Sequence, residues 1–232
     1  MPSSVEGVAC HRFVQAFAHD LRQHLRAISV AAQRIQRHGG EALDPVIGAR
    51  LDEVLSAVQR QEQLITSAVD YGEATEPPTG SMMPLSLVLQ TACLRVDEFR
   101  KAREGAIQMP ESGNIPAVKI PSGLAKAFEK ILHNGLKFCP AGEQPKLTVT
   151  IDDDPDTAVR IEFADRGVGI EAAYRERVFE PFQKLQPGEF PGTGMGLSIA
   201  KNMIEAAGGN IAIADRSDGG RGTTVAVEIP HQ

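Results

Sequence analysis

Two apolar stripes, each with residues spaced alternately by three and four, dominate the first seventy residues of the chain. The first stripe covers residues 14–35 and is interrupted by His24, and the second covers residues 47–68. Such spacing places the apolar residues along one side of a helix. A glycine break at Gly39 and a turn at Asp44 separate the two stretches. The pattern therefore predicts a helical hairpin.

The narrowness of these stripes predicts how the hairpin is completed. Two helices with narrow stripes cannot enclose a core by themselves. Pairing two hairpins about a two-fold axis gives a four-helix bundle in which both stripes leave water. We therefore expect a homodimer.

A Pro-, Gly- and Thr-containing segment at residues 72–80 separates the hairpin from a region of different character. Beyond it, the sequence predicts helices at 86–103, 122–138 and 195–207, and strands at 106–109, 117–120, 147–151, 158–163, 210–214 and 223–229. Antiparallel hairpins interspersed with helices imply an α+β layer. We therefore expect two domains, at 1–75 and 76–232.

Charge and cysteine content narrow the class of protein. A net charge of −6 and a pI near 5.6 argue against a general nucleic-acid-binding surface. Three cysteines without a CxxC arrangement suit reduced thiols rather than a disulfide framework or a zinc site. The sequence contains no run of about 18 apolar residues, so it predicts neither a signal peptide nor a membrane span. We expect a soluble cytoplasmic protein with neither nucleic acid nor membrane as partner.

His19 is predicted to face solvent. It lies two residues after Phe17 and two before Leu21, roughly opposite the first apolar stripe. An exposed imidazole followed by Asp20 can act as a nucleophile beside an acid that orients its ring. A surface histidine next to a helix acid, without function, is the alternative for the pair taken alone.

Short motifs resemble those of sensor histidine kinases of two-component systems, particularly the phytochrome-like group. Residues 17–28, FAHDLRQHLRAI, are similar to the phosphoacceptor box of that family. Further segments resemble, in the same order, its N box, first glycine box, F box, second glycine box and last glycine-rich box, at 129–138, 165–170, 178–182, 192–197 and 219–224. Five boxes in the right order leave little to chance.

The resemblance covers nearly the whole chain, about residues 13–230, and implies both a fold and a function. It implies a phosphotransfer hairpin followed by the ATP-binding α/β sandwich shared with certain chaperones, topoisomerases and mismatch-repair ATPases. The implied reaction uses ATP and Mg²⁺ to phosphorylate His19 and passes the phosphoryl group to an aspartate of a response-regulator receiver domain. Because residues 1–12 leave no room for an input domain, we expect a separate sensor protein or a longer parent chain.

The N box carries the expected metal ligand. A helix asparagine can offer a neutral oxygen to Mg²⁺, which keeps several waters and phosphate oxygens as ligands. Asn134 is therefore the metal candidate, and Lys137, one turn later, is a phosphate partner. A plain polar residue near a helix end is the alternative for Asn134.

The first glycine box follows a hydrophobic strand. Gly167 and Gly169 permit tight turns and the close approach of a flat ligand to the backbone. The resemblance implies that Asp165 accepts a hydrogen bond from the adenine amino group. An Asx turn after a strand is the alternative for this motif alone.

Residues 183–194 lack a periodic apolar pattern and suit a mobile lid over nucleotide. The glycines that follow lead into a helix whose free N–H groups and positive dipole end can face phosphates; a merely flexible loop is the alternative. The resemblance adds Lys184 as a phosphate contact. The other expected nucleotide contacts in these boxes are Gly192, Gly194, Gly196, Leu197 and Thr223.

Three positions depart from the family pattern. Lys130 stands where relatives commonly have an asparagine, which puts the rate of phosphoryl transfer in doubt. His24 replaces a proline that bends the helix in relatives, so this helix is expected to run straighter. Gln23 replaces a threonine or asparagine that positions water for dephosphorylation of the partner; a Gln amide can also orient water, and a solvated surface Gln is the alternative.

Two other classes of function remain open from the sequence. A dimeric phosphotransfer adaptor or pseudokinase would keep the hairpin with little ATP turnover, as Lys130 and His24 favour. An ATPase of the chaperone-like superfamily, or a serine kinase acting on an anti-sigma antagonist, would use the same pocket without a phosphohistidine. A measurement of nucleotide binding would distinguish the adaptor or pseudokinase from an active kinase. Substitution of His19 would distinguish the ATPase or serine kinase from a histidine kinase.

Overall fold

The computed structural model describes residues 4–40, 43–77, 80–185 and 190–231, with side chains described from residue 14 onward. Contacts divide the chain into two compact units, Met1–Glu73 and Ala74–Gln232. Each unit is described by itself. No helix in the described part of the chain is long and apolar enough to cross a membrane.

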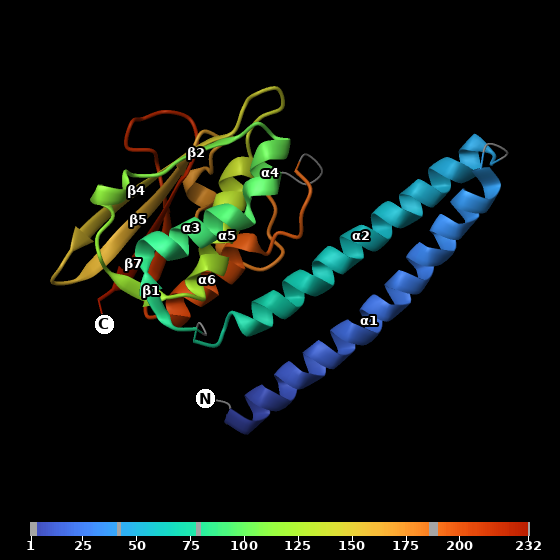
Figure 1. Cartoon of the computed structure of the whole chain (residues 1–232), viewed down its shortest axis with the longest axis horizontal. Coiled ribbons are helices and arrows are strands. Elements are labelled where there is room, and N and C mark those ends of the chain that lie inside the picture. Colours follow the sequence, from blue (N-terminus) through green and yellow to red (C-terminus); the bar gives the residue numbers. More distant parts are fainter. Residues whose placement is uncertain (1–3, 41–42, 78–79, 186–189, 232) are drawn as a thin grey trace. The chain divides into compact units, whose positions relative to one another are not determined.

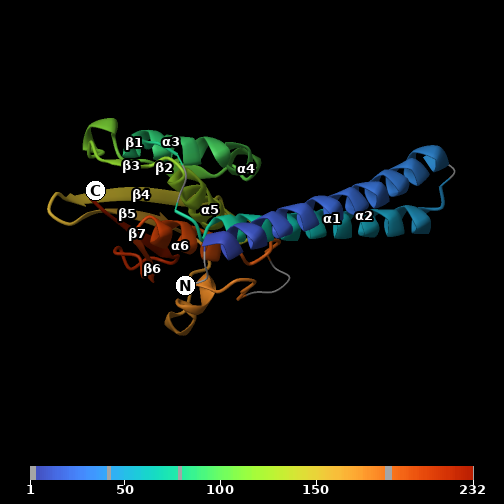
Figure 2. The same ribbon diagram turned by 90° about the horizontal axis from the view of Figure 1, so that it is seen from below.

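The first unit is the predicted helical hairpin. Helices α1 (Ser4–Gly39) and α2 (Pro45–Glu73) run side by side (Figures 1 and 2). Ala18, Ala32 and Val58 are buried in this unit, and small alanines allow two helices to approach closely. The expected linker at 72–80 begins too early, because α2 continues to Glu73 and a glycine near a helix end costs only about 1 kcal/mol.

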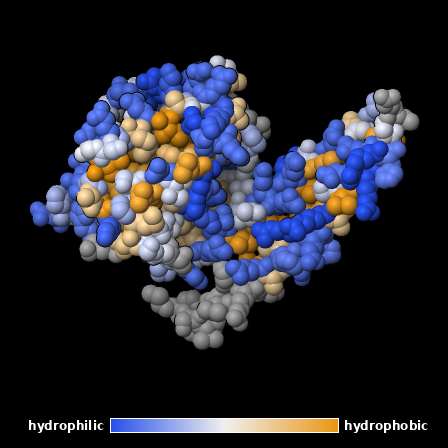
Figure 3. Space-filling model, in the orientation of Figure 1, coloured by the Kyte–Doolittle hydropathy of each residue, from blue (hydrophilic) through white to orange (hydrophobic). Residues whose placement is uncertain are grey.

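The apolar stripes are only partly covered by the hairpin itself. Ile28, Ile35, Ile47 and Val54 are between 41% and 51% exposed. Figure 3 shows hydrophobic residues at the surface of the hairpin. The contact between the two helices therefore leaves much of both stripes open in a single chain.

The second unit is an α+β domain, as predicted. Its helices are α3 (Leu85–Arg95), α4 (Asp97–Ala102), α5 (Leu124–Lys137) and α6 (Gly196–Ala206), with 3-10 turns at Ser112–Asn114, Ala172–Tyr174 and Arg177–Phe179. Its strands are β1 (Met82–Pro84), β2 (Ala106–Gln108), β3 (Lys119–Pro121), β4 (Lys146–Asp154), β5 (Ala158–Asp165), β6 (Asn210–Ala214) and β7 (Thr224–Pro230). Helices α3, α5 and α6 lie on one side of strands β4, β5 and β7 (Figure 1).

The second unit differs from the expectation in three ways. The main sheet has the order β2-β4-β5-β7-β6, and β2 pairs with β4 in parallel rather than antiparallel. A crossover through β3 and α5 separates β2 from β4, and such crossovers join parallel strands. Strand β1, which was not expected, pairs with β3. The helix expected at 86–103 is broken at Val96, whose buried side chain accompanies a non-helical ψ of 1°.

Buried and less buried side chains alternate along β5, and the buried ones extend the apolar core to the candidate site. Val159, Ile161 and Phe163 are buried at every second position, and Asp165 continues the same series at the end of the strand. Since alternate side chains of a strand share one face, Asp165 points to the face that carries the apolar core. Phe163 packs against Phe128 of α5 with the two rings tilted and their centroids 5.5 Å apart, which holds α5 against this end of the sheet.

Candidate functional site

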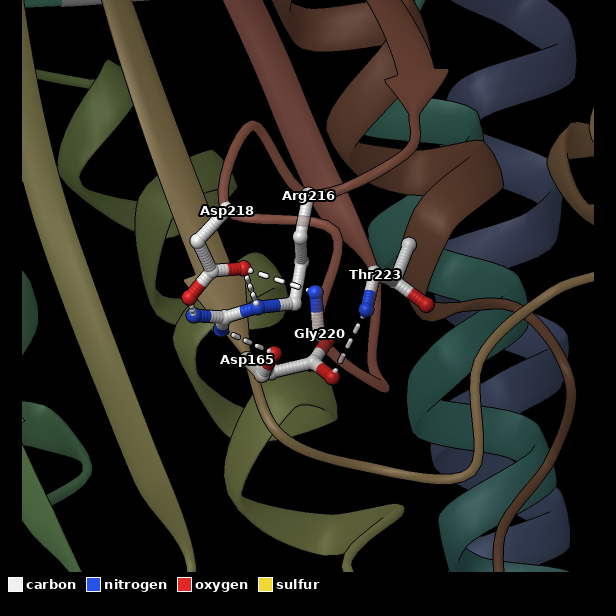
Figure 4. Close-up of polar contacts among 5 residues, drawn as sticks. All are labelled: Asp165, Arg216, Asp218, Gly220 and Thr223. Carbon is white, nitrogen blue, oxygen red and sulfur yellow. Dashed lines mark hydrogen bonds and ion pairs between the residues drawn. The ribbon is translucent and has the colours of Figure 1, made fainter.

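Asp165 is the centre of the candidate site. It is 8% exposed, and its Oδ1 accepts a hydrogen bond from the backbone N–H of Gly167 at 2.8 Å. The same oxygen accepts the backbone N–H of Thr223 at 3.1 Å (Figure 4). Within the part of the chain that the structure describes, Oδ2 has no hydrogen-bond donor. One oxygen is thus fixed by the backbone while the other remains available to a ligand N–H group.

Opposing effects act on the pKa of the Asp165 carboxyl group. Burial has the largest effect and raises the pKa of its carboxyl, whereas hydrogen bonds from Gly167 and Thr223 and the charge of Arg216 lower the pKa only in part. A buried carboxylate with one saturated oxygen is a directional acceptor. It suits a neutral N–H donor such as an exocyclic amino group of a nucleobase.

Close backbone packing brings α5 to this carboxylate. A Cβ built on Gly135 would lie 2.5 Å from Leu147 Cδ1 and 3.3 Å from Asp165 Cβ, so the absence of a side chain lets α5 reach the ends of β4 and β5. A Cβ on Gly167 would lie 2.5 Å from the carbonyl oxygen of Phe138. The first glycine box therefore lies directly against the C-terminal end of α5.

The second glycine box lies against the same helix. A Cβ built on Gly196 would lie 3.3 Å from Asn134 Nδ2 and 3.4 Å from its Oδ1. A Cβ on Gly192 would lie 2.5 Å from Lys137 Nζ. The predicted metal ligand and the predicted phosphate partner thus meet the segment that leads into α6, whose first backbone N–H groups can face an anion.

The remaining predicted nucleotide residues surround this arrangement. Lys184 lies close enough to lower the pKa of Lys137. Gly169 (φ 82°) approaches the Gly222 carbonyl, and Gly194 (φ 76°) approaches that of Gln183. Leu197 is half-buried in the first turn of α6. Part of the predicted lid, residues 186–189, lies outside the described residues.

Asn134 fits the expected magnesium ion through the chemistry of its donors. The described residues contain no group of three His, Cys, Asp or Glu side chains that could hold a metal. Asn134 of α5 offers a single amide oxygen beside the start of α6, which leaves most of the coordination shell of the ion to phosphate oxygens and water. Mg²⁺ is commonly bound in this way beside nucleotide phosphates, with few protein ligands.

Lys137 is predicted to make nucleotide binding pH-dependent. Burial, followed by the nearby charge of Lys184, lowers the pKa of Lys137 to about 8. Because the amine loses its charge as the pH rises through this value, calorimetry should show affinity for a non-hydrolysable ATP analogue falling from about pH 7 to about pH 9. Lys137→Met should remove this step, and Lys184→Met should move it to higher pH. An unchanged step in Lys137→Met would contradict the assignment.

The predicted phosphoacceptor residues lie on α1, in the other unit. The side chains of His19 and Asp20 are 68% and 74% exposed, and His19 Nδ1 lies 3.5 Å from Asp20 Oδ1. Gln23 is also exposed, about one turn further along the helix. Since Nδ1 is directed at the carboxylate, Nε2 is the ring nitrogen that faces away from it.

Sequence reasoning missed Arg216 and Asp218. They lie in the loop between β6 and β7, where Arg216 Nη1 donates to the backbone oxygen of Asp165 at 2.7 Å (Figure 4). The two opposite charges after a strand could have predicted an ion pair. The acceptor on Asp165 is 51 residues away in the chain, and no local pattern reports it.

Comparisons with known proteins agree with this geometry. A family model described as histidine kinase-, DNA gyrase B-, and HSP90-like ATPase matches residues 119–232. The phytochrome-like protein Cph1 of Synechocystis sp. is 30% identical over 94% of this chain and 29% of its own length. The sensor histidine kinase WalK of Bacillus subtilis is 29% identical over 62% of this chain and 24% of its own length.

Solved structures share the fold at lower identity. Full-length ShkA in complex with AMPPNP has a TM-score of 0.70 and 19% identity, covering 95% of this chain and 46% of that chain. ThkA in complex with the response regulator protein TrrA has a TM-score of 0.62 and 18% identity, covering 95% of this chain and 61% of that chain. The predicted resemblance is confirmed, as is the predicted fold class of a helical region followed by an α/β ATPase domain. The chain spans less than a third of the length of Cph1 and WalK.

Proposed function

We propose that this chain is an ATP-dependent protein histidine kinase. Its residues 119–232 match the family model of histidine kinase-, DNA gyrase B-, and HSP90-like ATPases. His19 takes the γ-phosphoryl group of ATP and passes it to an aspartate of a response-regulator receiver domain. One observation carries the nucleotide half of this proposal. Asp165 is buried with Oδ1 fixed by two backbone donors and Oδ2 open to an adenine amino group.

Phosphate binding falls to the residues around the start of α6. Asn134 would hold Mg²⁺, which when bound neutralises phosphate charge. Lys137 and Lys184 add positive charge, and the first backbone N–H groups of α6 can donate to phosphate oxygens. The contact between Asn134 and Gly196 supports this division of roles, because it places the amide beside those N–H groups.

The chemistry at His19 follows from the orientation of its ring. With Nδ1 directed at Asp20, Nε2 is free to attack the γ-phosphorus in line. The N–P bond forms as the P–O bond to ADP breaks. Asp20 orients the ring and stabilises the positive charge that develops on it. Gln23, one turn away, is positioned for a water that later hydrolyses the phosphorylated partner.

Partners follow from the same proposal. Exposed Arg26, together with Arg22, offers a basic face near His19 for an acidic receiver site. The complex of ThkA with TrrA supports a response regulator as the partner. A separate sensor protein and a cytoplasmic location complete the proposed setting.

Dimerisation is predicted to depend on the uncovered stripe of α1. Ile35 is 51% exposed in the single chain, and burying such a side chain stabilises an assembly by about 1.5–3 kcal/mol. In a symmetric dimer Ile35→Lys removes this contribution twice, so sedimentation equilibrium should show dissociation into monomers. Val30→Lys is the matched control, because Val30 is 44% exposed but lies outside the stripe. Equal dimer stability in both variants would contradict the proposed bundle.

The direct test of the proposed function is incubation of the purified protein with γ-labelled ATP and Mg²⁺. Retained label should be acid-labile and base-stable, as phosphohistidine is. Asn134→Ala should lose this label. Absence of label in the wild type, with nucleotide still bound, would overturn the kinase in favour of the phosphotransfer adaptor or pseudokinase that Lys130 and His24 favour.

A further inference from the structure

The β6–β7 loop holds an arginine that the proposed chemistry does not use. The side chain of Arg216 is 8% exposed, and its Nη1 donates to the backbone oxygen of Asp165 at 2.7 Å (Figure 4). Asp218 holds the guanidinium through two bonds, from Nε at 2.8 Å and from Nη2 at 2.5 Å. Asp218 Oδ1 also accepts the backbone N–H of Gly220 at 3.0 Å. Arg216 is thus fixed by its own loop while it contacts Asp165.

The same loop contacts Asp165 at two further points. The backbone N–H of Thr223 donates to Asp165 Oδ1, and its carbonyl accepts the Asp165 N–H at 2.9 Å. A Cβ built on Gly222 would lie 2.0 Å from the Asp165 carbonyl oxygen. The loop therefore holds the main chain of Asp165 through Arg216 and its carboxylate through Thr223.

Charge gives Arg216 a role beyond packing. Other charged and titratable groups lie around this site. They are Asp218 and Arg221 on the same loop, Arg166 next in the chain, and Cys139 after α5 with its neighbours Glu143 and Arg103. Burial raises the pKa of Asp165, and the charge of Arg216 lowers it, in addition to the larger effects of the hydrogen bonds from Gly167 and Thr223. An arginine here favours the carboxylate form, which accepts hydrogen bonds but cannot donate them.

We propose that Arg216, held by Asp218, is a positioning residue that orients Asp165 and keeps it an acceptor for the adenine amino group of ATP. The inference rests on the proposed function, in which Asp165 reads adenine. It assigns adenine selectivity to a loop arginine that does not touch the nucleotide. Guanine presents a carbonyl oxygen at the corresponding position, which a carboxylate repels.

The experiment measures binding of non-hydrolysable ATP and GTP analogues to the full chain as a function of pH. Wild-type affinity for the ATP analogue should fall as the pH falls through the pKa of Asp165, because the protonated carboxyl is a poorer acceptor. Arg216→Gln should weaken ATP binding about tenfold at neutral pH. It should also move the acid midpoint to higher pH and reduce the preference for ATP over GTP. Arg216→Lys, which keeps the charge, should keep the midpoint near its wild-type value.

A matched control separates positioning from stability. Arg160 is likewise an arginine paired with carboxylates, those of Glu162 and Glu228, but it does not contact Asp165. Arg160→Gln should therefore bind both analogues as the wild type does. Equal affinity and an equal midpoint in Arg216→Gln would overturn the inference alone, as would weaker binding at every pH without a shift in midpoint. Absence of ATP binding in the wild type would overturn the proposed function together with the inference.

Discussion

His19→Gln is expected to reduce retained label from γ-labelled ATP by about 10³-fold or more. Glutamine is similar in size and polar, but its amide nitrogen is not a nucleophile that forms a stable N–P bond. His19 and the nucleotide-binding residues lie in separate units of the chain. Affinity for a non-hydrolysable ATP analogue should therefore stay within about twofold of the wild-type value. Filter-retained label and calorimetry on the same preparation measure the two quantities.

A second histidine on the same helix supplies the control for this substitution. His24 is exposed five residues after His19, so His24→Gln tests whether any exposed imidazole on α1 accepts the phosphoryl group. Label should be retained in His24→Gln and lost in His19→Gln. Label that persists in His19→Gln would place the acceptor elsewhere and favour a kinase of another class, such as a serine kinase. Asp20→Asn should lower the rate of labelling without abolishing it, since Asp20 orients the ring rather than attacking phosphorus.

Periodicity predicts the features of this chain that depend on neighbours in the sequence. The spacing around His19 places it opposite the apolar stripe, and its side chain is 68% exposed. The strand that ends at Asp165 and the glycines after it predict a tight turn, and the carboxylate caps the N–H of Gly167 two residues later. In both cases the pattern and the contact span only a few residues, so the residues of one helix or one turn determine the outcome.

Features that depend on distant residues escape the same reasoning. The contact of Arg216 with Asp165 requires the loop between β6 and β7 to cross the end of β5, which follows from the strand order rather than from any motif. The parallel pairing of β2 with β4 depends on where the crossover through α5 returns. The break at Val96 reflects burial of that side chain over helix propensity. Tertiary packing decides each of these, and the local sequence is compatible with more than one outcome.

Gly222→Ala is expected to abolish nucleotide binding more completely than a change at any other loop glycine. The residue has φ 127°, where a side chain costs about 1–3 kcal/mol of backbone strain. A Cβ there would also lie 2.0 Å from the carbonyl oxygen of Asp165 and 3.0 Å from Arg166 Cα. Neither contact is with a flexible side chain, so the loop or the end of β5 must move. Calorimetry should show affinity for the ATP analogue weakened by about 100-fold or more.

Gly219→Ala separates strain from collision in this prediction. Gly219 lies in the same loop with φ 67°, but a Cβ there meets nothing within 4 Å. It should therefore show the strain alone, as a modest fall in melting temperature with at most a few-fold loss of affinity. If the two variants bind equally well, the loop can move without displacing Asp165. The contacts of residues 216–223 with Asp165 would then not be needed for nucleotide binding. A large loss in Gly222→Ala with a small loss in Gly219→Ala would mean that nucleotide affinity depends on the position of Asp165 itself, which this loop fixes.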